Sequence, residues 1–416
     1  MASQFAISEA EVNEMNSIMH SGMVTDVLAK VEYMLEQMKS VPLNIAVTGE
    51  SGAGKSSFIN AFRGVSDDEP EAAETGVTET TQKALPYSHP TASNVLLWDL
   101  PGIGTPSFQP GTYLEDVGLL KYDVFIIVTA DRFQEYHSAL AQYIMQAQKK
   151  FYFVRNKVDR DLKANARRKS QRGLSDDDVL NLLRVDCEKN LGNGQVERPK
   201  VFLLSCFHPH RYDFPVLQMT LLQELEGHKR HALLLSIPNL SASLIQSKRE
   251  ALAQDVWKKA IVACLSSLKK DGTPNLIVPK LMETLKHYQQ TFCVDAKSLH
   301  RLANITDISF EKLQSEVTST FGRELLAQEV ENLLSQVASG HQLMANQLES
   351  RVPILGTIIT GGISFVACYL LLKSALKDMS EDGERVMEKS LLNSVGNGCP
   401  PHRPSWSVCS KGGMNL

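Results

Sequence analysis

Residues 49–56, with the sequence GESGAGKS, constrain this chain more than any other stretch. Glycines, a lysine and a hydroxyl residue stand at the spacing of a phosphate-binding loop, between an apolar run and a helix-like segment. Glycines let backbone N–H groups turn toward phosphate oxygens, and the following helix adds the positive end of its dipole. A glycine-rich turn that binds nothing is the weaker alternative. The loop residues predicted to contact a nucleotide are Gly49, Glu50, Ser51, Gly52, Ala53, Gly54, Lys55, Ser56 and Ser57.

From residue 43 to about residue 230, short apolar runs alternate with helical stretches. Near-continuous hydrophobicity in such short runs predicts strands that are buried on both faces, and hence an α/β fold with a mainly parallel sheet covered by helices. Ligands of such folds bind at the carboxyl ends of the strands, where the motifs described below also fall. The predicted strands are Leu43–Thr48, Asn94–Leu100, Asp123–Thr129, Phe151–Asn156 and Lys200–Ser205.

A magnesium ion and an outer phosphate are expected next to the loop. Lys55 is predicted to reach the outer phosphates, and the hydroxyl of Ser56 to bind Mg²⁺. Asp99 ends the second apolar run and Gly102 follows it, so the aspartate can hold Mg²⁺ through water and the glycine N–H can face a γ-phosphate. A threonine that senses both should come from the polar stretch 75–81. Its candidates are Thr75, Thr78, Thr80 and Thr81, of which Thr81 is favoured and Thr75 stays open.

The base of the nucleotide is predicted from Asn156-Lys157-Val158-Asp159, which ends the fourth run. The Asp159 carboxylate can accept hydrogen bonds from the N1–H and the exocyclic amine of guanine. Adenine lacks this donor pair and would leave the carboxylate buried and unpaired. Asn156 can support the base edge, and the aliphatic stem of Lys157 can cover the ring. Ser205 and Cys206, at the end of the last run, are expected to close the guanine pocket.

The residue after Gly102 bears on hydrolysis. Ras-type enzymes place a glutamine there to orient the attacking water, whereas this chain has Ile103. Another loop or another molecule must therefore orient the water, and Glu50 and Glu79 are the nearby polar residues. An acidic side chain repels its own phosphates, so Glu50 is expected to contact something else, such as a ribose or a partner subunit's nucleotide. With Lys55, these two glutamates are the predicted catalytic residues.

The chain is long enough for more than one domain: of its 416 residues 43% are hydrophobic and 22% charged, the balance of a globular protein. Residues 8–39 have the pattern of an amphipathic helix, so 1–41 are predicted to join a helical domain that spans 235–392. Residues 42–234 are the predicted P-loop domain. The glycines and prolines of 393–416 predict a disordered tail.

Residues 352–372 form an apolar run of 21 residues without a charge. This length suffices to cross a hydrocarbon core of about 30 Å, although the glycines and hydroxyls of the run suit close helix packing. We expect the central buried helix of the helical domain here. A membrane-spanning helix is the alternative.

Longer strings resemble the immunity-related GTPases, the interferon-inducible p47-type family; they are GESGAGKSSFINAFRG, WDLPGIG, TADRF, YFVRNKVD and HRYDFPVL. The resemblance runs from about residue 8 to 390, and Lys55 is typical of the GKS branch. It implies a Ras-like GTPase domain flanked by a helical domain built from both terminal segments. The family's catalytic glutamates correspond to Glu50 and Glu79, and its nucleotide-contacting switch residues to Thr75 and Gly76.

The resemblance also implies a function: GTP hydrolysis to GDP with Mg²⁺, GTP-dependent self-assembly with activation between subunits, and cell-autonomous defence at intracellular membranes, such as those of pathogen-containing vacuoles. The alternative is a binding module that GTP controls and in which hydrolysis is incidental. The net charge of −4 without a basic stripe argues against nucleic acid. Seven cysteines without a CxxC pair, and no secretory signal, predict a reducing, cytoplasmic compartment. Peripheral association with intracellular membranes is what the resemblance implies. Ala2 excludes N-terminal myristoylation, which many family members have.

Overall fold

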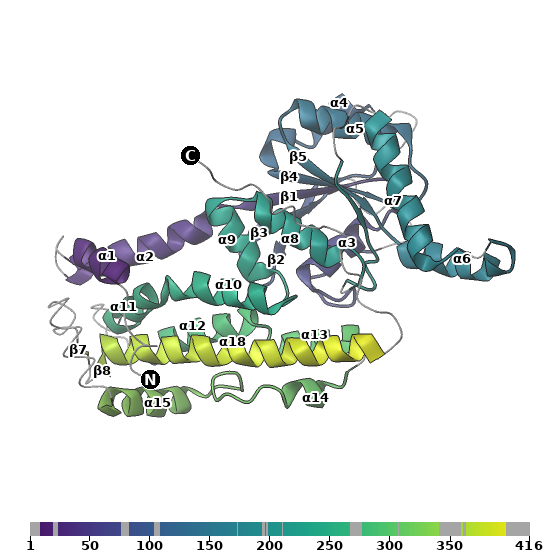
Figure 1. The fold of residues 1–416 in the computed structure, drawn as a ribbon. Helices are drawn as coiled ribbons and strands as arrows, with labels where there is room; N and C mark the ends of the chain where they lie inside the picture. Colours follow the sequence, from purple (N-terminus) through teal and green to yellow (C-terminus); the bar gives the residue numbers. More distant parts are fainter. Residues whose placement is uncertain are drawn as a thin grey trace, which may run out of the picture.

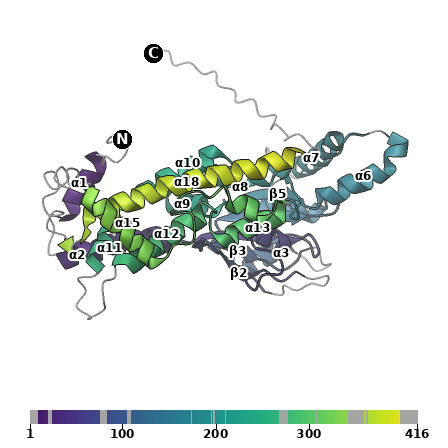
Figure 2. The ribbon, with the colours of Figure 1, turned by 90° about the horizontal axis from the view of Figure 1, so that it is seen from below.

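The computed structural model describes residues 9–19, 24–75, 83–103, 109–172, 174–193, 196, 199–209, 211–266, 277–306, 308–340, 359–360 and 363–396. A sheet layered between helices lies on one side of the molecule and a bundle of helices on the other (Figure 1). The long helix near the C-terminus, α18 (Phe365–Gly396), runs along the length of the bundle, as the view from below shows (Figure 2). The nucleotide motifs all belong to the sheet part.

The sheet has the strand order β2-β3-β1-β4-β5-β6, and every pairing is parallel except that of β2 with β3. All five predicted strands are present, and β2 was not predicted. Because β2 is a half-exposed edge strand with a proline, it lacks the apolar run of a central strand. The strands are β1 (Leu43–Thr48), β2 (Leu85–His89), β3 (Ala92–Asp99), β4 (Val124–Thr129), β5 (Lys150–Arg155) and β6 (Val201–Leu203).

Helices cover both faces of the sheet and bury a separate apolar layer on each. One layer contains side chains of α3 (Lys55–Arg63), α8 (Phe214–Glu224) and α9 (Gly227–Ser236). The opposite layer contains side chains of α4 (Pro110–Asp116), α5 (Glu135–Gln146) and α7 (Asp176–Asn193). A short 3-10 helix, η2 (Leu119–Lys121), precedes β4, and α6 (Val158–Arg172) projects from the sheet part with the end of α7 (Figure 1). The near-continuous hydrophobicity of β1 and β4 therefore reflects burial from two sides.

The helical bundle shares one apolar cluster that extends from Val12 near the N-terminus to Met387 near the C-terminus. Segments from both ends of the chain therefore build a single core. Its helices are α1 (Glu9–Met19), α2 (Val24–Ser40), α10 (Ala242–Ala253), α11 (Val256–Ser266), α12 (Ile277–Thr291), α13 (Ala296–Thr306), α14 (Phe310–Gln314), α15 (Ala327–Gly340) and α18 (Phe365–Gly396).

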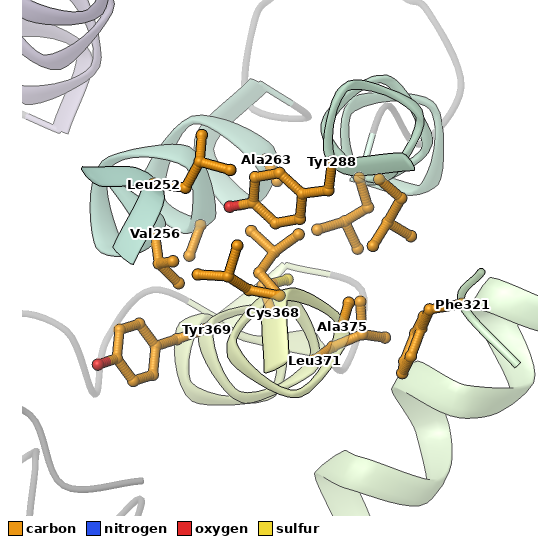
Figure 3. Packing of buried hydrophobic residues seen from close by; sticks show 14 of the residues in the cluster. Leu252, Val256, Ala263, Tyr288, Phe321, Cys368, Tyr369, Leu371 and Ala375 are labelled. Atoms are coloured by element: carbon orange, nitrogen blue, oxygen red, sulfur yellow. The ribbon is translucent and has the colours of Figure 1, made fainter. Parts of the chain in front are cut away.

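Helix α18 is the centre of this cluster (Figure 3). Its residues Cys368, Leu371 and Ala375 pack against side chains of α10 and α11 and against Tyr288 of α12, which is fully buried. Residues 365–372 are all buried, so the apolar composition of this stretch serves packing between helices.

Two predictions about the C-terminal part need correction. The apolar run 352–372 is not one helix, because α18 begins at Phe365 and is preceded by the short antiparallel pair β7 (Ile359–Thr360) and β8 (Ile363–Ser364); residues 352–358 lie outside the described part. The predicted tail at 393–416 begins too early, because α18 continues to Gly396; the remainder lies outside the described residues. Within the part of the chain that the structure describes, no helix combines the length and the apolar character needed to cross a bilayer.

Ion pairs join the two parts at the loop that follows α3. Arg301 of α13 donates from Nε and Nη2 to the two carboxylate oxygens of Glu69, at 2.9 and 2.7 Å. Lys297, one turn earlier, donates to Oε1 of Glu71 at 2.9 Å. These contacts fix the loop that leads toward residue 75. The helical bundle therefore contacts residues that lie only a few positions before the predicted switch in the sequence.

Candidate functional site

The phosphate loop connects β1 to α3. At two of its positions only glycine fits, because neighbouring atoms leave no room for a Cβ. Gly49 has φ +148°, and a Cβ there would lie 1.9 Å from the carbonyl oxygen of Val128 on β4. Gly54 has φ +91°, and its Cβ would lie 2.5 Å from Nδ2 of Asn156. Gly52 also has a positive φ of +77° but faces open space. The loop can therefore lie against β4 and the guanine motif only because both close positions lack a side chain.

The metal and phosphate residues meet at the start of α3. The Lys55 ammonium lies within the loop and donates to the carbonyl oxygens of Gly49 and Glu50, at 3.1 and 3.2 Å. The Ser56 hydroxyl donates to Oδ2 of Asp99 at 2.7 Å, and Asp99 is buried at the end of β3. A hydroxyl and a carboxylate at one point beside an ammonium are the oxygen donors that Mg²⁺ takes in phosphate sites. The donor set fits this metal.

The segment after β3 lies against the phosphate loop. Leu100 donates its N–H to the carbonyl of Val47 at 3.0 Å, and Ile103 donates to the carbonyl of Gly49 at 3.1 Å. Gly102 is half-buried between them, and the Ile103 side chain is 3% exposed within the apolar layer of α4 and α5. Ile103 thus has a packing role, which explains why the position that holds glutamine in Ras-type enzymes is apolar here.

The guanine motif is attached to the same loop. Asn156 donates from Nδ2 to the carbonyl of Ala53 at 3.0 Å, and Lys157 donates from Nζ to the carbonyl of Gly52 at 2.7 Å. Lys157 has φ +61°, a conformation that is rare for a residue with a side chain and that is typical of functional loops. These contacts place the predicted base-reading segment directly beside the predicted phosphate-binding segment.

The base-reading carboxylate is supported by the last strand. Oδ1 of Asp159 accepts a hydrogen bond from the Ser205 hydroxyl at 2.8 Å, and Lys163 lies 3.5 Å from Oδ2. Cys206 donates its N–H to Oδ1 of Asn156 at 3.3 Å. Asp159 is 8% exposed and Ser205 is fully buried. The two residues that were predicted to close the pocket therefore contact the guanine motif, Ser205 through its hydroxyl and Cys206 through its backbone N–H.

The Glu50 carboxylate faces the connection between β4 and α5. Its Oε1 accepts from the Thr129 hydroxyl at 2.7 Å and from the Ala130 N–H at 3.0 Å, and its Oε2 accepts from Nε2 of His137 at 2.9 Å. Burial opposes ionisation of this carboxyl, but the hydrogen bonds of His137, Thr129 and Ala130 outweigh burial and lower the pKa of Glu50 below its usual value. Glu50 is therefore an ionised side chain in contact with its own chain.

Known proteins were compared with the chain as a whole. The family model of the interferon-inducible GTPases (IIGP) matches residues 8–355. The chain belongs to this family. It is 38% identical over 387 residues to interferon-inducible GTPase 5 of Bos taurus, which covers 92% of this chain and 83% of that protein. It is 34% identical over 387 residues to interferon-gamma-inducible GTPase 10 of Mus musculus, with 93% and 90% covered. Interferon-inducible GTPase 1 of Mus musculus is 38% identical over 315 residues, with 75% and 76% covered.

Membership identifies the chain as a GTP-binding and GTP-hydrolysing enzyme of the immunity-related type with a Ras-like P-loop domain. The structure brings together most of the residues predicted for its site. Thr75 is exposed at the end of a described segment, whereas Gly76, Thr78, Glu79, Thr80 and Thr81 lie outside the described residues. The choice between the switch threonines and the role of Glu79 therefore stay predictions.

Two residues of this interferon-inducible GTPase that touch the loop were missed. His137 lies in the first turn of α5 and Thr129 ends β4, and both contact Glu50. They are separated from Glu50 by 87 and 79 positions, so no local spacing connects them. Only the string TADRF, which begins at Thr129, marked this region, and it did so through the family resemblance.

Proposed function

We propose that the loop 49–57 and the guanine motif hold GTP together with Mg²⁺, and that hydrolysis to GDP and phosphate is completed between two copies of the chain. This proposal rests on one observation: the same loop lies next to a pair of oxygen donors suited to Mg²⁺ and next to the guanine motif. Ser56 contacts Asp99 at one end, and the carbonyl of Ala53 accepts from Asn156 at the other. A nucleotide laid along the loop would meet both ends.

At the phosphate end, the Lys55 ammonium would exchange its contacts with the carbonyls of Gly49 and Glu50 for β- and γ-phosphate oxygens. The Gly102 N–H would face the γ-phosphate. Ser56 and Asp99 would hold Mg²⁺, with Thr81 as the favoured further ligand and Thr75 the alternative. When bound, this ion neutralises charge on the phosphate oxygens. Nucleotide contacts are proposed for Gly49, Glu50, Ser51, Gly52, Ala53, Gly54, Lys55, Ser56, Ser57, Thr75, Gly76, Gly102, Asn156, Lys157, Asp159, Ser205 and Cys206.

At the base end, Asp159 would accept both N–H donors of guanine. Its Oδ1 already accepts from Ser205 and Oδ2 lies 3.5 Å from Lys163, so the orientation of the carboxylate is fixed. Lys157 is fixed by its contact with Gly52, and its stem would cover the ring. Adenine would leave the nearly buried Asp159 without a donor, which is the basis of the proposed selectivity.

Hydrolysis requires water to attack the γ-phosphorus, while the bond to the β–γ bridging oxygen breaks and GDP leaves. No polar side chain stands at Ile103, and the Glu50 carboxylate is engaged with three donors of its own chain. We infer that Glu79 orients the water and that a second copy completes the site. A single chain would then hydrolyse GTP slowly, and self-assembly would accelerate it.

The test is specific GTPase activity, measured over a hundredfold range of protein concentration at saturating GTP and Mg²⁺. An activity that rises with concentration supports catalysis between subunits. An activity that is flat and low, with GTP binding intact, would replace this proposal by the second one, a binding module that GTP controls. The apolar position of Ile103 favours that second function among the alternatives, because it removes the usual source of water orientation.

We also propose that the protein acts in the cytoplasm, at the surface of intracellular membranes, in cell-autonomous innate defence. Family membership supports the defence role. Sedimentation with phosphatidylcholine–phosphatidylserine vesicles in GTP, in GDP and without nucleotide measures the association; binding that is equally absent in all three would refute the membrane role.

We infer a division into an N-terminal helical segment 1–41, a GTPase domain 42–234 and a helical domain that begins at residue 235 and includes α18 to its end at Gly396. The apolar clusters support it, because Val12 and Met387 share one cluster and Leu43 and Leu221 share another. Leu244 of α10 belongs to the sheet cluster, so the helical domain would pack on the GTPase domain rather than be linked loosely.

A further inference from the structure

The His137 ring is held in one orientation and one tautomer. It is fully buried, and the rings of Phe133, Tyr136 and Phe153 surround it with centroids at 5.3, 4.5 and 5.5 Å. Its Nδ1 accepts the N–H of Gln134 at 3.1 Å, so the proton of the neutral ring is on Nε2. That Nε2–H is the donor to Oε2 of Glu50.

Glu50 transmits this contact to the phosphate loop. While its side chain accepts from His137, its carbonyl accepts from the Ala53 N–H at 3.1 Å and from the Lys55 ammonium at 3.2 Å. The backbone of Glu50 also forms an isolated parallel bridge with Ile103. One residue therefore connects the buried ring of α5 to the lysine that is expected to hold phosphate.

The arrangement disfavours an outward rotation of the Glu50 side chain in the isolated chain. Rotation would remove the acceptor of the His137 Nε2–H, and an N–H without an acceptor is costly in a ring that is fully buried among aromatic side chains. The Thr129 hydroxyl and the Ala130 N–H would lose their acceptor in the same movement. A carboxylate with three donors of this kind is a structural anchor for the loop.

We propose that His137 is a positioning residue, which acts through Glu50 to hold the phosphate loop in its nucleotide-binding shape. The inference rests on the proposed nucleotide site. In this role Glu50 contributes to nucleotide affinity and not to orientation of the attacking water. The sequence predicted a catalytic Glu50 whose side chain contacts a ribose or a partner subunit's nucleotide.

The test compares two substitutions in the full-length protein. His137→Phe keeps a ring but has no donor, and loss of a hydrogen bond to a charged group should raise the Kd for GDP by about tenfold to a hundredfold. KM for GTP should rise in parallel, with kcat at saturating GTP and fixed protein concentration within about twofold of the original. His137→Gln can still donate from its amide, and it should restore Kd to within about threefold.

Phe133→Leu is the matched control, because Phe133 packs on the same ring but donates nothing to Glu50. It should lower Tm without changing the Kd for GDP. An original protein that fails to bind GDP would refute the nucleotide site itself. If the unsubstituted protein binds GDP and folded His137→Phe binds it with an unchanged Kd, then only the positioning role is refuted. A lower kcat at unchanged KM in His137→Phe would also refute that role, because it would make Glu50 catalytic.

Thr129→Val tests the same anchor from its other oxygen and guards against a His137→Phe variant that does not fold. Valine matches the shape of threonine and removes the hydroxyl that donates to Oε1 at 2.7 Å. We expect a rise in the Kd for GDP of about threefold to tenfold. An unchanged Kd in this variant would contradict the role of Glu50 as an anchor.

Discussion

Replacement of Gly49 by alanine should damage both stability and nucleotide binding, and the structure sets the scale. The new Cβ would lie 1.9 Å from the Val128 carbonyl oxygen, whereas ordinary contact begins at 3.4 Å. Loop and strand must therefore separate by about 1.5 Å, the difference between these two distances. Val128 cannot yield easily, because it is fully buried in β4, between β1 and β5.

Two terms add up for Gly49→Ala. Overpacking in a rigid core costs about 1–3 kcal/mol, and a positive φ costs an alanine about 1–2 kcal/mol more. Gly52→Ala, in the same loop, has only the second term, because its Cβ would meet nothing within 4 Å. Alanine also restricts the unfolded chain, which offsets about 0.4–1 kcal/mol in both variants. We expect Gly49→Ala to be less stable than Gly52→Ala by about 1–3 kcal/mol.

The assay is urea unfolding of both variants, with a titration of GDP on the folded proteins. A displaced Gly49 carbonyl would lose its contacts with Lys55 and Ile103, so the Kd for GDP should rise at least about tenfold in Gly49→Ala and much less in Gly52→Ala. If both variants unfold at the same urea concentration and bind GDP alike, then the close approach of β4 does not limit the loop, and the reasoning is wrong.

Three further substitutions test separate features. Asp159→Asn replaces an acceptor by a group that also donates, so GDP should bind at least about a hundredfold more weakly. The diphosphate of xanthosine, which has an oxygen at C2, should lose less affinity. If parallel titrations show an unchanged preference for GDP over xanthosine diphosphate, the assigned base contact is wrong. Arg301→Gln tests the link between the parts. The hydrogen bond from Arg301 is the largest cause that lowers the pKa of Glu69 from 4.5 to about 2, so the pair stabilises the fold above pH 4.5 and loses this contribution as pH falls toward 2. The unsubstituted protein should exceed Arg301→Gln in stability by about 1–2 kcal/mol at pH 7, and thermal melts should show this difference shrinking as pH falls from 4.5 toward 2. A difference that stays constant over this range would refute the assignment. Lys248→Met removes a fully buried ammonium that donates to the carbonyls of Ile237 and Thr291 and to Asn239, at 2.6, 2.9 and 3.0 Å. The variant should lose about 2–4 kcal/mol in urea unfolding at pH 7. Burial lowers the pKa of Lys248 from 10.5 to about 8, so the unfolded chain binds more protons than the folded chain between these pH values. The unsubstituted protein should therefore gain stability relative to Lys248→Met as pH rises from 8 to 10. A loss of stability relative to the variant would contradict this reasoning.

Features whose signal is local were predictable from the sequence. The five central strands are continuous apolar runs, and the phosphate loop and guanine motif have fixed spacings. β2 has neither property, because one edge strand can be half-exposed and contain Pro86. The start of α18 was missed for a related reason. An apolar run has no periodicity that separates strand from helix, so 352–372 could not reveal that β8 ends at Ser364 and the helix begins at Phe365.

The contacts of the Glu50 side chain could not be predicted. Charge repulsion predicted that its carboxylate contacts something other than its own phosphates, such as a ribose or a partner subunit's nucleotide. The partner proved to be His137 of the same chain, which is placed by the pairing of β4 with β1 and by the start of α5. Such a contact depends on which strand lies next to which, and no spacing along the chain encodes it.

The phosphate loop is therefore held from three directions by residues that need not touch a nucleotide. Val128 limits how close β4 allows the loop to come, Asn156 fixes its middle, and His137 fixes Glu50 at its beginning. Each contact reaches a loop carbonyl, a glycine or a carboxylate, which leaves most of the loop N–H groups available to a phosphate. Affinity for GTP should then depend on packing along β4 and α5 as much as on the motif itself.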